Sequence, residues 1–174
     1  MKEFEFTLKF ALANPSLDPS YHVEALGEAG CDDALIGIGI KGRIAFEFCR
    51  EAESALDAMT SAIKDVRGVI PDATLIEATP DLVGLTDIAE AFGVTRQAIR
   101  KLVQVRVYDF PLPVHEGNPS LWHLAPVLTW AESNHRAFKH ELLEVSRVAM
   151  QVNLAKEYVV IEPAIQQQIS AALA

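Results

Sequence analysis

Residues 85–102 read LTDIAEAFGVTRQAIRKL, and this stretch decides the organisation of the second half of the chain. Ala89 is small, so a second helix can cross the first one closely at that point. Gly93 follows where the first helix should end, because a residue without Cβ adopts a left-handed conformation at little cost. Thr86 and Thr95 can each cap the first turn of a helix. The pattern predicts two helices joined by a tight turn, a helix-turn-helix.

The apolar residues of this stretch have the spacing of one shared inner face: Ile88, Phe92, Val94, Ile99 and Leu102. With that face turned inward, the second helix presents polar side chains outward. Arg can bond guanine and Gln can bond adenine in the major groove, whereas Lys and a helix N-terminus suit phosphate. We therefore predict DNA-binding residues at Thr95, Arg96, Gln97, Arg100, Lys101, Gln104 and Arg106. The alternative is a solvated basic face on an ordinary helical hairpin.

Residues 110–130, which follow this motif, read FPLPVHEGNPSLWHLAPVLTW. The informative features are Phe110-Pro111, Pro113, the Gly117-Asn118 turn, Trp122, and a helical segment at 127–130. On these features, residues 82–132 resemble the winged helix-turn-helix of MerR-like and AlpA-like, excisionase-type regulators. The resemblance implies a short β-hairpin wing beside the recognition helix, and then another helix that closes the core.

The same resemblance implies which wing residues can contact the DNA backbone. These are His115, Asn118 and Ser120, and for His115 an ordinary exposed loop histidine is the alternative. Glu116 departs from a basic wing. Trp122 and Trp130 are expected in the core, because large aromatic rings contribute most when they are buried.

Residues 1–80 have the periodicity of a second, separate domain. Phe4, Phe6, Leu8, Phe10 and Leu12 alternate with polar residues, which predicts a half-buried strand. A helix should run from Asp18-Pro19, with Val23 and Leu26 inward, to Gly30. Residues 31–39 and 42–50 should form a β-hairpin, with Ala34, Ile36, Ile38, Ile44, Phe46 and Phe48 facing inward.

Ser54 should then cap a second helix with Leu56, Met59, Ile63, Val66 and Ile70 on its inner face, and residues 73–79 supply a last strand. The order β-α-β-β-α-β suggests a ferredoxin-like domain with both helices on one face of an antiparallel sheet. The other face is expected to be open, with Glu3, Glu5, Thr7, Lys9, Arg43, Ala45 and Glu47. Solvated surface, an interface or a partner site are the alternatives for it.

The last segment contains Phe138, Leu142, Val145, Ala149 and Val152 at steps of four and three, which predicts a long amphipathic helix at about 135–155. This helix could pair with a second copy or pack on its own wing domain. We expect the dimer, because two half-sites give a helix-turn-helix protein its specificity. The predicted fold is α+β, divided into a ferredoxin-like domain (1–80), a winged helix-turn-helix (82–132) and a C-terminal helical dimerisation segment (133–174).

Composition narrows the class of protein. The net charge is −9, but residues 1–81 hold 7 basic and 15 acidic residues, whereas residues 82–150 hold 7 of each. The local basic cluster at 96–106 suits binding at a particular site better than non-specific coating of DNA. A cytoplasmic location is expected, because no apolar run approaches a membrane span and the first residues lack a signal-peptide pattern.

Residues that could carry other chemistry are few. Cys31 and Cys49 predict buried reduced thiols, with a redox pair as the alternative, and no Cys or His spacing predicts a zinc site. His22, Asp32 and Asp33 are the candidates for an enzyme or small-molecule sensor built on the first domain, but positions at the starts of helices and strands ordinarily hold polar residues. No cofactor and no catalytic residues are predicted.

Together these features predict a dimeric, sequence-specific DNA-binding transcriptional regulator, with repression by promoter occupancy as the expected mode. One alternative is an excisionase-like or antitoxin-like DNA-binding protein whose acidic first domain holds a protein partner. The other is a small-molecule sensor or enzyme built on that domain.

Overall fold

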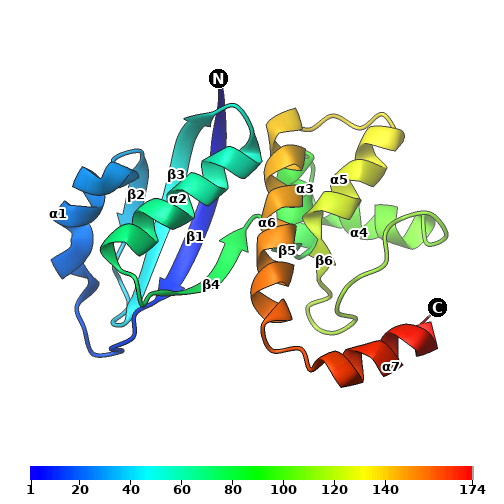
Figure 1. Cartoon of the computed structure of the whole chain (residues 1–174). Helices are drawn as coiled ribbons and strands as arrows, with labels where there is room; N and C mark the ends of the chain where they lie inside the picture. Colours follow the sequence, from blue (N-terminus) through cyan, green and yellow to red (C-terminus); the bar gives the residue numbers. More distant parts are fainter. Residues whose placement is uncertain (174) are drawn as a thin grey trace.

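The computed structural model describes residues 1–173 and has a mixed α+β architecture. A four-stranded antiparallel sheet contains β1 (Lys2–Ala11), β2 (Ala34–Gly37), β3 (Arg43–Ala52) and β4 (Thr74–Thr79). The strands lie in the order β2-β3-β1-β4 (Figure 1). The α+β class and the antiparallel sheet are confirmed. In residues 1–173, no helix combines the length and the apolar character needed to cross a lipid bilayer.

The sheet forms because β1 and β3 both alternate between apolar and polar residues, so their pairing places every aromatic ring on one face. Phe6 lies opposite Phe48 with the ring centroids 5.2 Å apart, and Phe10 contacts Phe46 edge to face at 6.0 Å. Helix α2 (Ala55–Val69) packs on this face through Met59 and other small or apolar residues. Its first turn is capped as predicted, because Ser54 Oγ accepts a hydrogen bond from the Asp57 amide at 3.1 Å.

The prediction of one regular helix from Asp18 to Gly30 is wrong. A 3-10 turn (Pro19–His22), the single-turn α1 (Val23–Leu26) and a π turn (Gly27–Cys31) replace it. Gly30 has a φ of 102°, which breaks the helical path. Leu26 is buried as expected, but Val23 is exposed.

Two more predicted inward residues face solvent. Ile38 lies beyond the end of β2 and is 39% exposed, and Leu56 in the first turn of α2 is 56% exposed. Each sits at the end of its element, where periodicity in the sequence gives no information on whether another element covers the side chain.

The second half of the chain folds around its own core. It contains β5 (Leu82–Val83), α3 (Leu85–Ala91), α4 (Arg96–Val105), β6 (Trp122–His123) and α5 (Leu124–Ser133). Trp122 and Trp130 are buried as predicted, and Phe110 lies between them with centroid distances of 6.4 and 4.9 Å. The helix expected around residues 127–130 is therefore present as α5.

The strand pairing in the region expected to form the wing hairpin is shorter than predicted. The returning strand β6 pairs with β5, through Leu82 with His123 and Val83 with Trp122. Within residues 106–121, a single bridge between His115 and Leu121 is all the pairing that the structure describes. Pro111, Pro113 and Pro119 lack the amide protons that a longer ladder needs, which is a physical reason for a loop here.

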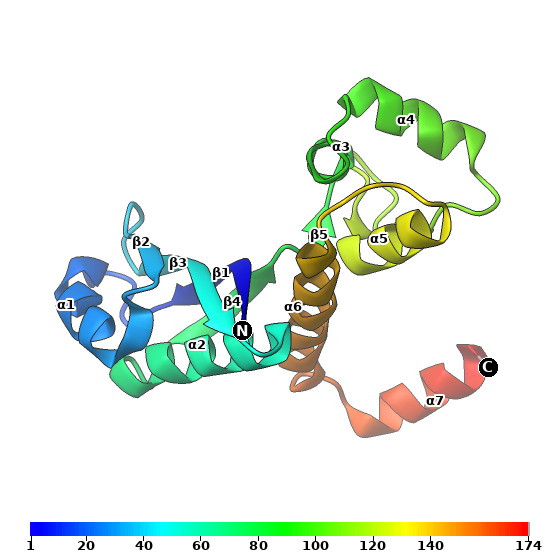
Figure 2. The same cartoon turned by 90° about the horizontal axis from the view of Figure 1, so that it is seen from above.

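Helix α6 (His140–Tyr158) joins the two halves (Figure 1). Val145 and Ala149 are buried in the core of the sheet half, whereas Leu143 is buried in the core of the second half. The apolar face that was expected to pair with a second copy is thus covered by the chain's own sheet and helices. Helix α7 (Pro163–Leu173) follows and projects away from both cores (Figure 2).

Candidate nucleic-acid interface

The connection between α3 and α4 has the geometry expected of a tight turn. Gly93 has a φ of 62°, and its amide donates to the Glu90 carbonyl at 3.1 Å. The Val94 amide donates to the Ala89 carbonyl at 2.9 Å, so these bonds end α3. Ala89 is only 3% exposed and belongs to the core of this half, and α3 and α4 contact each other, as expected for a small residue at a close helix crossing.

The caps of the two helices follow the prediction only at α4. Thr95 Oγ1 accepts a hydrogen bond from the Ala98 amide at 3.2 Å, as expected of a capping residue. The prediction for Thr86 is wrong, because α3 begins earlier. Its start is stabilised by the Asp87 carboxylate, which accepts from the Gly84 amide at 2.7 Å.

Helix α4 separates apolar from polar residues around its axis. Ile99 is 1% exposed and packs in the core, with Leu102 and Val103 half-buried beside it. Val94 departs from the predicted inner face and is 44% exposed, since it belongs to the turn. The predicted reading residues are all exposed on the outer side of the helix: Arg96, Gln97, Arg100, Lys101 and Gln104.

Among the described residues, the cations of this outer face have no acidic partner. Across residues 1–173, no carboxylate oxygen lies within 4.0 Å of the charged nitrogens of Arg96, Arg100 or Lys101, whereas Lys2 pairs with Glu144 at 2.7 Å. The first turn of α4 also contains no acidic residue. The positive end of the helix dipole therefore adds to the side-chain charge, and both favour an anion there.

Arg106 differs from the other predicted DNA-binding residues. Its Nε and Nη2 donate to the two carboxylate oxygens of Asp109 at 3.0 and 2.6 Å, and Nη2 also donates to Asn134. The guanidinium lies 5.6 Å from the Trp130 ring centroid. The hydrogen bond with Arg106 lowers the pKa of Asp109 below its ordinary value. Arg106 is thus committed to holding the end of α4 on α5, an interaction that sequence spacing did not reveal.

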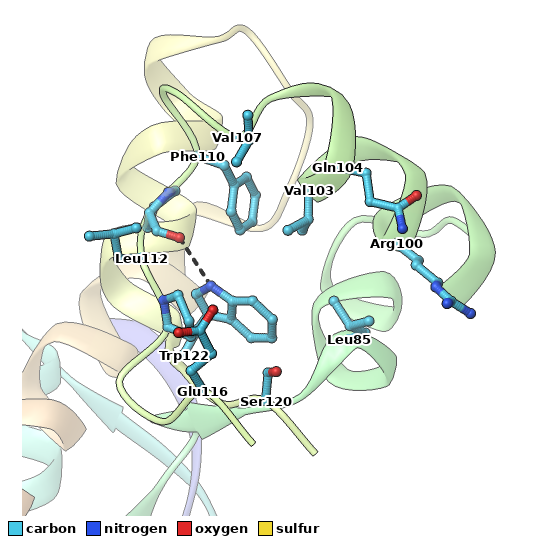
Figure 3. A pocket seen from close by; sticks show the side chains of 12 residues that line it. Leu85, Arg100, Val103, Gln104, Val107, Phe110, Leu112, Glu116, Ser120 and Trp122 are labelled. Atoms are coloured by element: carbon cyan, nitrogen blue, oxygen red, sulfur yellow. Dashed lines mark hydrogen bonds between the residues drawn. The ribbon is translucent and has the colours of Figure 1, made fainter. Parts of the chain in front are cut away.

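The three loop residues predicted for the wing do not all lie beside α4. A hollow of about 300 Å³ separates α4 from the loop, with Arg100 and Gln104 on one side and Glu116 and Ser120 on the other (Figure 3). Ser120 Oγ donates to the Gly117 carbonyl at 3.1 Å. His115 and Asn118 are exposed on the loop but do not line this hollow. The carboxylate of Glu116 makes the loop side of the hollow less favourable for phosphate.

A buried polar cluster sets how this half sits on the sheet half. Asp81 is 1% exposed, and its carboxylate lies 2.6 Å from His123 Nδ1 and 2.8 Å from Asn153 Nδ2. Asn153 also exchanges two 2.8 Å hydrogen bonds with the backbone of Ala78 in the edge strand β4. These residues were not predicted, because they lie far apart in the sequence and carry no local motif.

The candidates for other chemistry do not form one site. Asp33 is occupied by a bidentate pair with Arg50, Asp32 is exposed, and His22 lies on the turn at the far end of the sheet half. Cys31 is buried in the core as predicted, but Cys49 is exposed on the opposite face of the sheet, so the prediction of buried thiols is wrong for Cys49. The two faces also separate the thiols, which speaks against the alternative of a redox pair. Glu3, Glu5 and Cys49 approach one another within 4.8 Å on that exposed face.

No protein-family model, curated protein or solved structure matches the chain. The resemblance of residues 82–132 to MerR-like and AlpA-like regulators stays a prediction from the sequence.

Proposed function

We propose that this protein is a sequence-specific DNA-binding regulator whose helix α4 lies in the major groove. The observation that carries this proposal is the outer face of α4, where Arg96, Arg100 and Lys101 are exposed and have no acidic partner within residues 1–173. Gln97 and Gln104 share this face. Guanidinium and amide groups at helical spacing are the side chains that read guanine and adenine edges.

The position of α4 supports the same function. It lies at the outer edge of the molecule, on the side away from the four-stranded sheet (Figure 2). The acidic residues that dominate 1–81 therefore do not stand between α4 and an approaching duplex. This separation matters because exposed charges more than about 10 Å apart are largely screened at physiological salt.

We interpret the second half as a winged helix-turn-helix with a reduced wing, on the basis of the α3–turn–α4 geometry and the loop that follows. We interpret the first half as ferredoxin-like, because its element order and its strand order β2-β3-β1-β4 suit two interleaved βαβ units. The proposed DNA contacts are Thr95, Arg96, Gln97, Arg100, Lys101 and Gln104, with His115, Asn118 and Ser120 flanking them. Arg106 is left out because Asp109 and Asn134 hold it.

Repression is the proposed mode, since occupying a promoter needs only the DNA-binding surface. The test is selection of bound duplexes from a random pool, followed by binding titrations at fixed salt. Arg100→Ala should weaken binding to the selected site by about 1–3 kcal/mol and relax the preference at one base pair. Arg67→Ala, which removes an exposed arginine from α2, is the matched control and should leave binding unchanged. If the selection enriches no sequence motif, the proposal is overturned.

A further inference from the structure

The hollow between α4 and the loop that follows it, which we call the α4 pocket, has an apolar interior. Every residue that lines it is apolar except Arg100, Gln104, Glu116 and Ser120. Phe110 and Trp122 are the buried part of the lining, and Trp122 Nε1 already donates to the Pro111 carbonyl at 3.0 Å (Figure 3). The polar atom of the indole is therefore satisfied, and both rings offer carbon surface to a ligand.

Two large apolar side chains of the pocket are exposed to water. Leu112 is 85% exposed and Val107 is 59% exposed, and both line the hollow. Leu112 lies between Pro111 and Pro113, whose rings restrict the backbone and hold the loop in one conformation. A ligand with an apolar body would cover these side chains, and the removal of apolar surface from water favours binding.

The polar side chains around the pocket include a cation and an anion on opposite sides. Arg100 and Gln104 belong to α4, whereas Glu116 belongs to the loop (Figure 3). Within residues 1–173, these three side chains form no ion pair and no hydrogen bond with another side chain. Their charges and hydrogen-bonding groups are therefore available to a ligand.

These charges select among apolar ligands. A carboxylic acid places a negative charge beside Glu116, and an amine places a positive charge beside Arg100, so each of them is repelled from one side. A molecule with both groups meets the opposite charge on each side. The volume of about 300 Å³ lies at the lower limit of small-molecule sites and excludes a helix, which is about 10 Å wide. An α-amino acid with a large apolar side chain has this size and these charges.

We propose that the α4 pocket binds an α-amino acid with a large apolar side chain. The side chain of the ligand lies on Phe110 and Trp122, and an aromatic ring is favoured there because it can pack edge to face on them. The ammonium group of the ligand pairs with Glu116. Its carboxylate pairs with Arg100 and accepts from the Gln104 amide.

The same contacts regulate DNA binding, a step that rests on the proposed function. The guanidinium of Arg100 points away from the pocket in Figure 3, on the side that a duplex would approach. Exposed side chains change rotamer within nanoseconds, so a bound carboxylate can turn Arg100 inward. Arg100 cannot pair with the ligand and with a base at the same time. Ligand and DNA therefore compete, and the amino acid releases the protein from its site.

Isothermal titration calorimetry on the full chain tests the site with four probes. L-phenylalanine should bind with a Kd of about 10 µM to 1 mM, as expected for a ligand of this size. 3-Phenylpropionate lacks its ammonium group and 2-phenylethylamine lacks its carboxylate, and each should bind at least about fivefold more weakly. L-alanine has the charges without the apolar body and should not bind at 10 mM, roughly the concentration at which the apolar contact decides binding.

Two variants test the residues, each with a matched control. Glu116→Gln should weaken L-phenylalanine at least about fivefold without weakening 3-phenylpropionate, because it removes the partner of the ammonium group only. Glu53→Gln, at an exposed acid outside the pocket, should bind as the wild type does. Val107→Trp should block the pocket with its larger side chain. Val105→Trp is the same change at an exposed position that does not line the pocket, and it should still bind.

The site is overturned if L-phenylalanine does not bind, if 3-phenylpropionate binds equally well, or if Glu116→Gln binds as its control does. Competition is measured with the duplex selected by the wild type, and saturating L-phenylalanine should weaken DNA binding at least about fivefold. An unchanged DNA affinity would overturn the regulation. If the amino acid binds but the chain selects no DNA, the proposed function fails and the site stands. If the chain selects DNA but binds no amino acid, the site fails and the proposed function stands.

Discussion

The carboxylate of Asp81 lies 2.6 Å from His123 Nδ1 at the junction of the two halves of the molecule. A carboxylate accepts hydrogen bonds, so this contact fits the His123 tautomer that has its proton on Nδ1. The main-chain carbonyl of Asp81 also accepts from the Leu124 amide at 2.7 Å, where α5 begins. One buried acid therefore fixes the start of α5, the strand β6 and, through Asn153, the edge of the sheet.

Asp81→Ala should lower the free energy of unfolding by about 2–4 kcal/mol, because it leaves the donors of His123 and Asn153 without an acceptor. Urea unfolding followed by circular dichroism measures this change. Asp72→Ala, which truncates an exposed acid near the end of α2, is the control and should stay within about 0.5 kcal/mol of the wild type. Equal stability of the two variants would contradict this role of Asp81.

We expect Arg50 to make the largest single polar contribution to the stability of the sheet half. It is 7% exposed and donates to Asp33, Asp65, Ser61 and the Gly30 carbonyl at 2.6–3.0 Å. Burial alone would lower the pKa of Arg50, but the hydrogen bonds with Asp33 and Asp65 outweigh it and raise the pKa. Arg50→Ala should cost about 3–5 kcal/mol by thermal or urea unfolding, since it leaves both carboxylates without their buried partner.

Arg50→Lys distinguishes geometry from charge. An ammonium group cannot reproduce the fork of the guanidinium, so this variant should also be destabilised, by about 1–3 kcal/mol. Arg43→Lys, at an exposed position at the opposite end of β3, should be neutral. Full stability of Arg50→Lys would mean that charge alone suffices.

Cys31 should make stability depend on pH in the alkaline range. Burial raises the pKa of its thiol from an ordinary value near 9 to about 11, and the negative charge of Asp65 adds to the effect. The folded state therefore holds this proton more tightly than the unfolded state does. The contribution is present below pH 9 and is lost as the pH rises through 11, a decrease of about 2 kcal/mol at most. Urea unfolding from pH 8 to 11, with Cys31→Ala as the variant without this slope, measures it.

Arg100→Ala should affect DNA binding but not stability, whereas Arg106→Ala should affect stability but not the sequence preference. Arg100 is exposed on α4 and has no acidic partner in residues 1–173, so its loss should leave the melting temperature unchanged and weaken DNA binding. Arg106 is bound to Asp109 and Asn134, so its loss should lower the melting temperature. At temperatures well below its melting temperature, Arg106→Ala should retain the sequence preference of the wild type. Differential scanning fluorimetry measures the melting temperatures of both variants, and DNA titrations measure their binding. A loss of base preference in Arg106→Ala would show that Arg106 reads the DNA after all.

Gly93→Ala should destabilise the turn between α3 and α4. The φ of 62° is unfavourable for a residue with Cβ, although no atom lies within 4 Å of the position that a Cβ would occupy. The cost is therefore conformational only, about 1–2 kcal/mol. Gly68→Ala, at a helical position on α2 with open space around it, should stabilise the chain slightly and serves as the control. A neutral Gly93→Ala would show that the turn relaxes to another conformation.

The sequence by itself determined the elements whose signals are local. The alternation of Phe4, Phe6, Leu8 and Phe10 predicted β1, and Gly93 with Thr95 predicted the turn and the start of α4. Apolar periodicity, a positive φ and a side-chain cap each involve residues within a few positions of one another, so one sequence suffices to find them. The exposed face of α4 follows from the same periodicity.

Only the tertiary structure decided which surfaces meet. The apolar face of α6 has the same pattern whether it packs on a second copy or on its own chain, and here Val145 and Ala149 complete the core of the sheet half. Arg106 has the same sequence signature as Arg100, but Asp109 and Asn134 take it out of the outer face. Asp81, His123 and Asn153 meet from three distant segments. Such contacts depend on how separate elements pack, and periodicity within one element does not encode its neighbour.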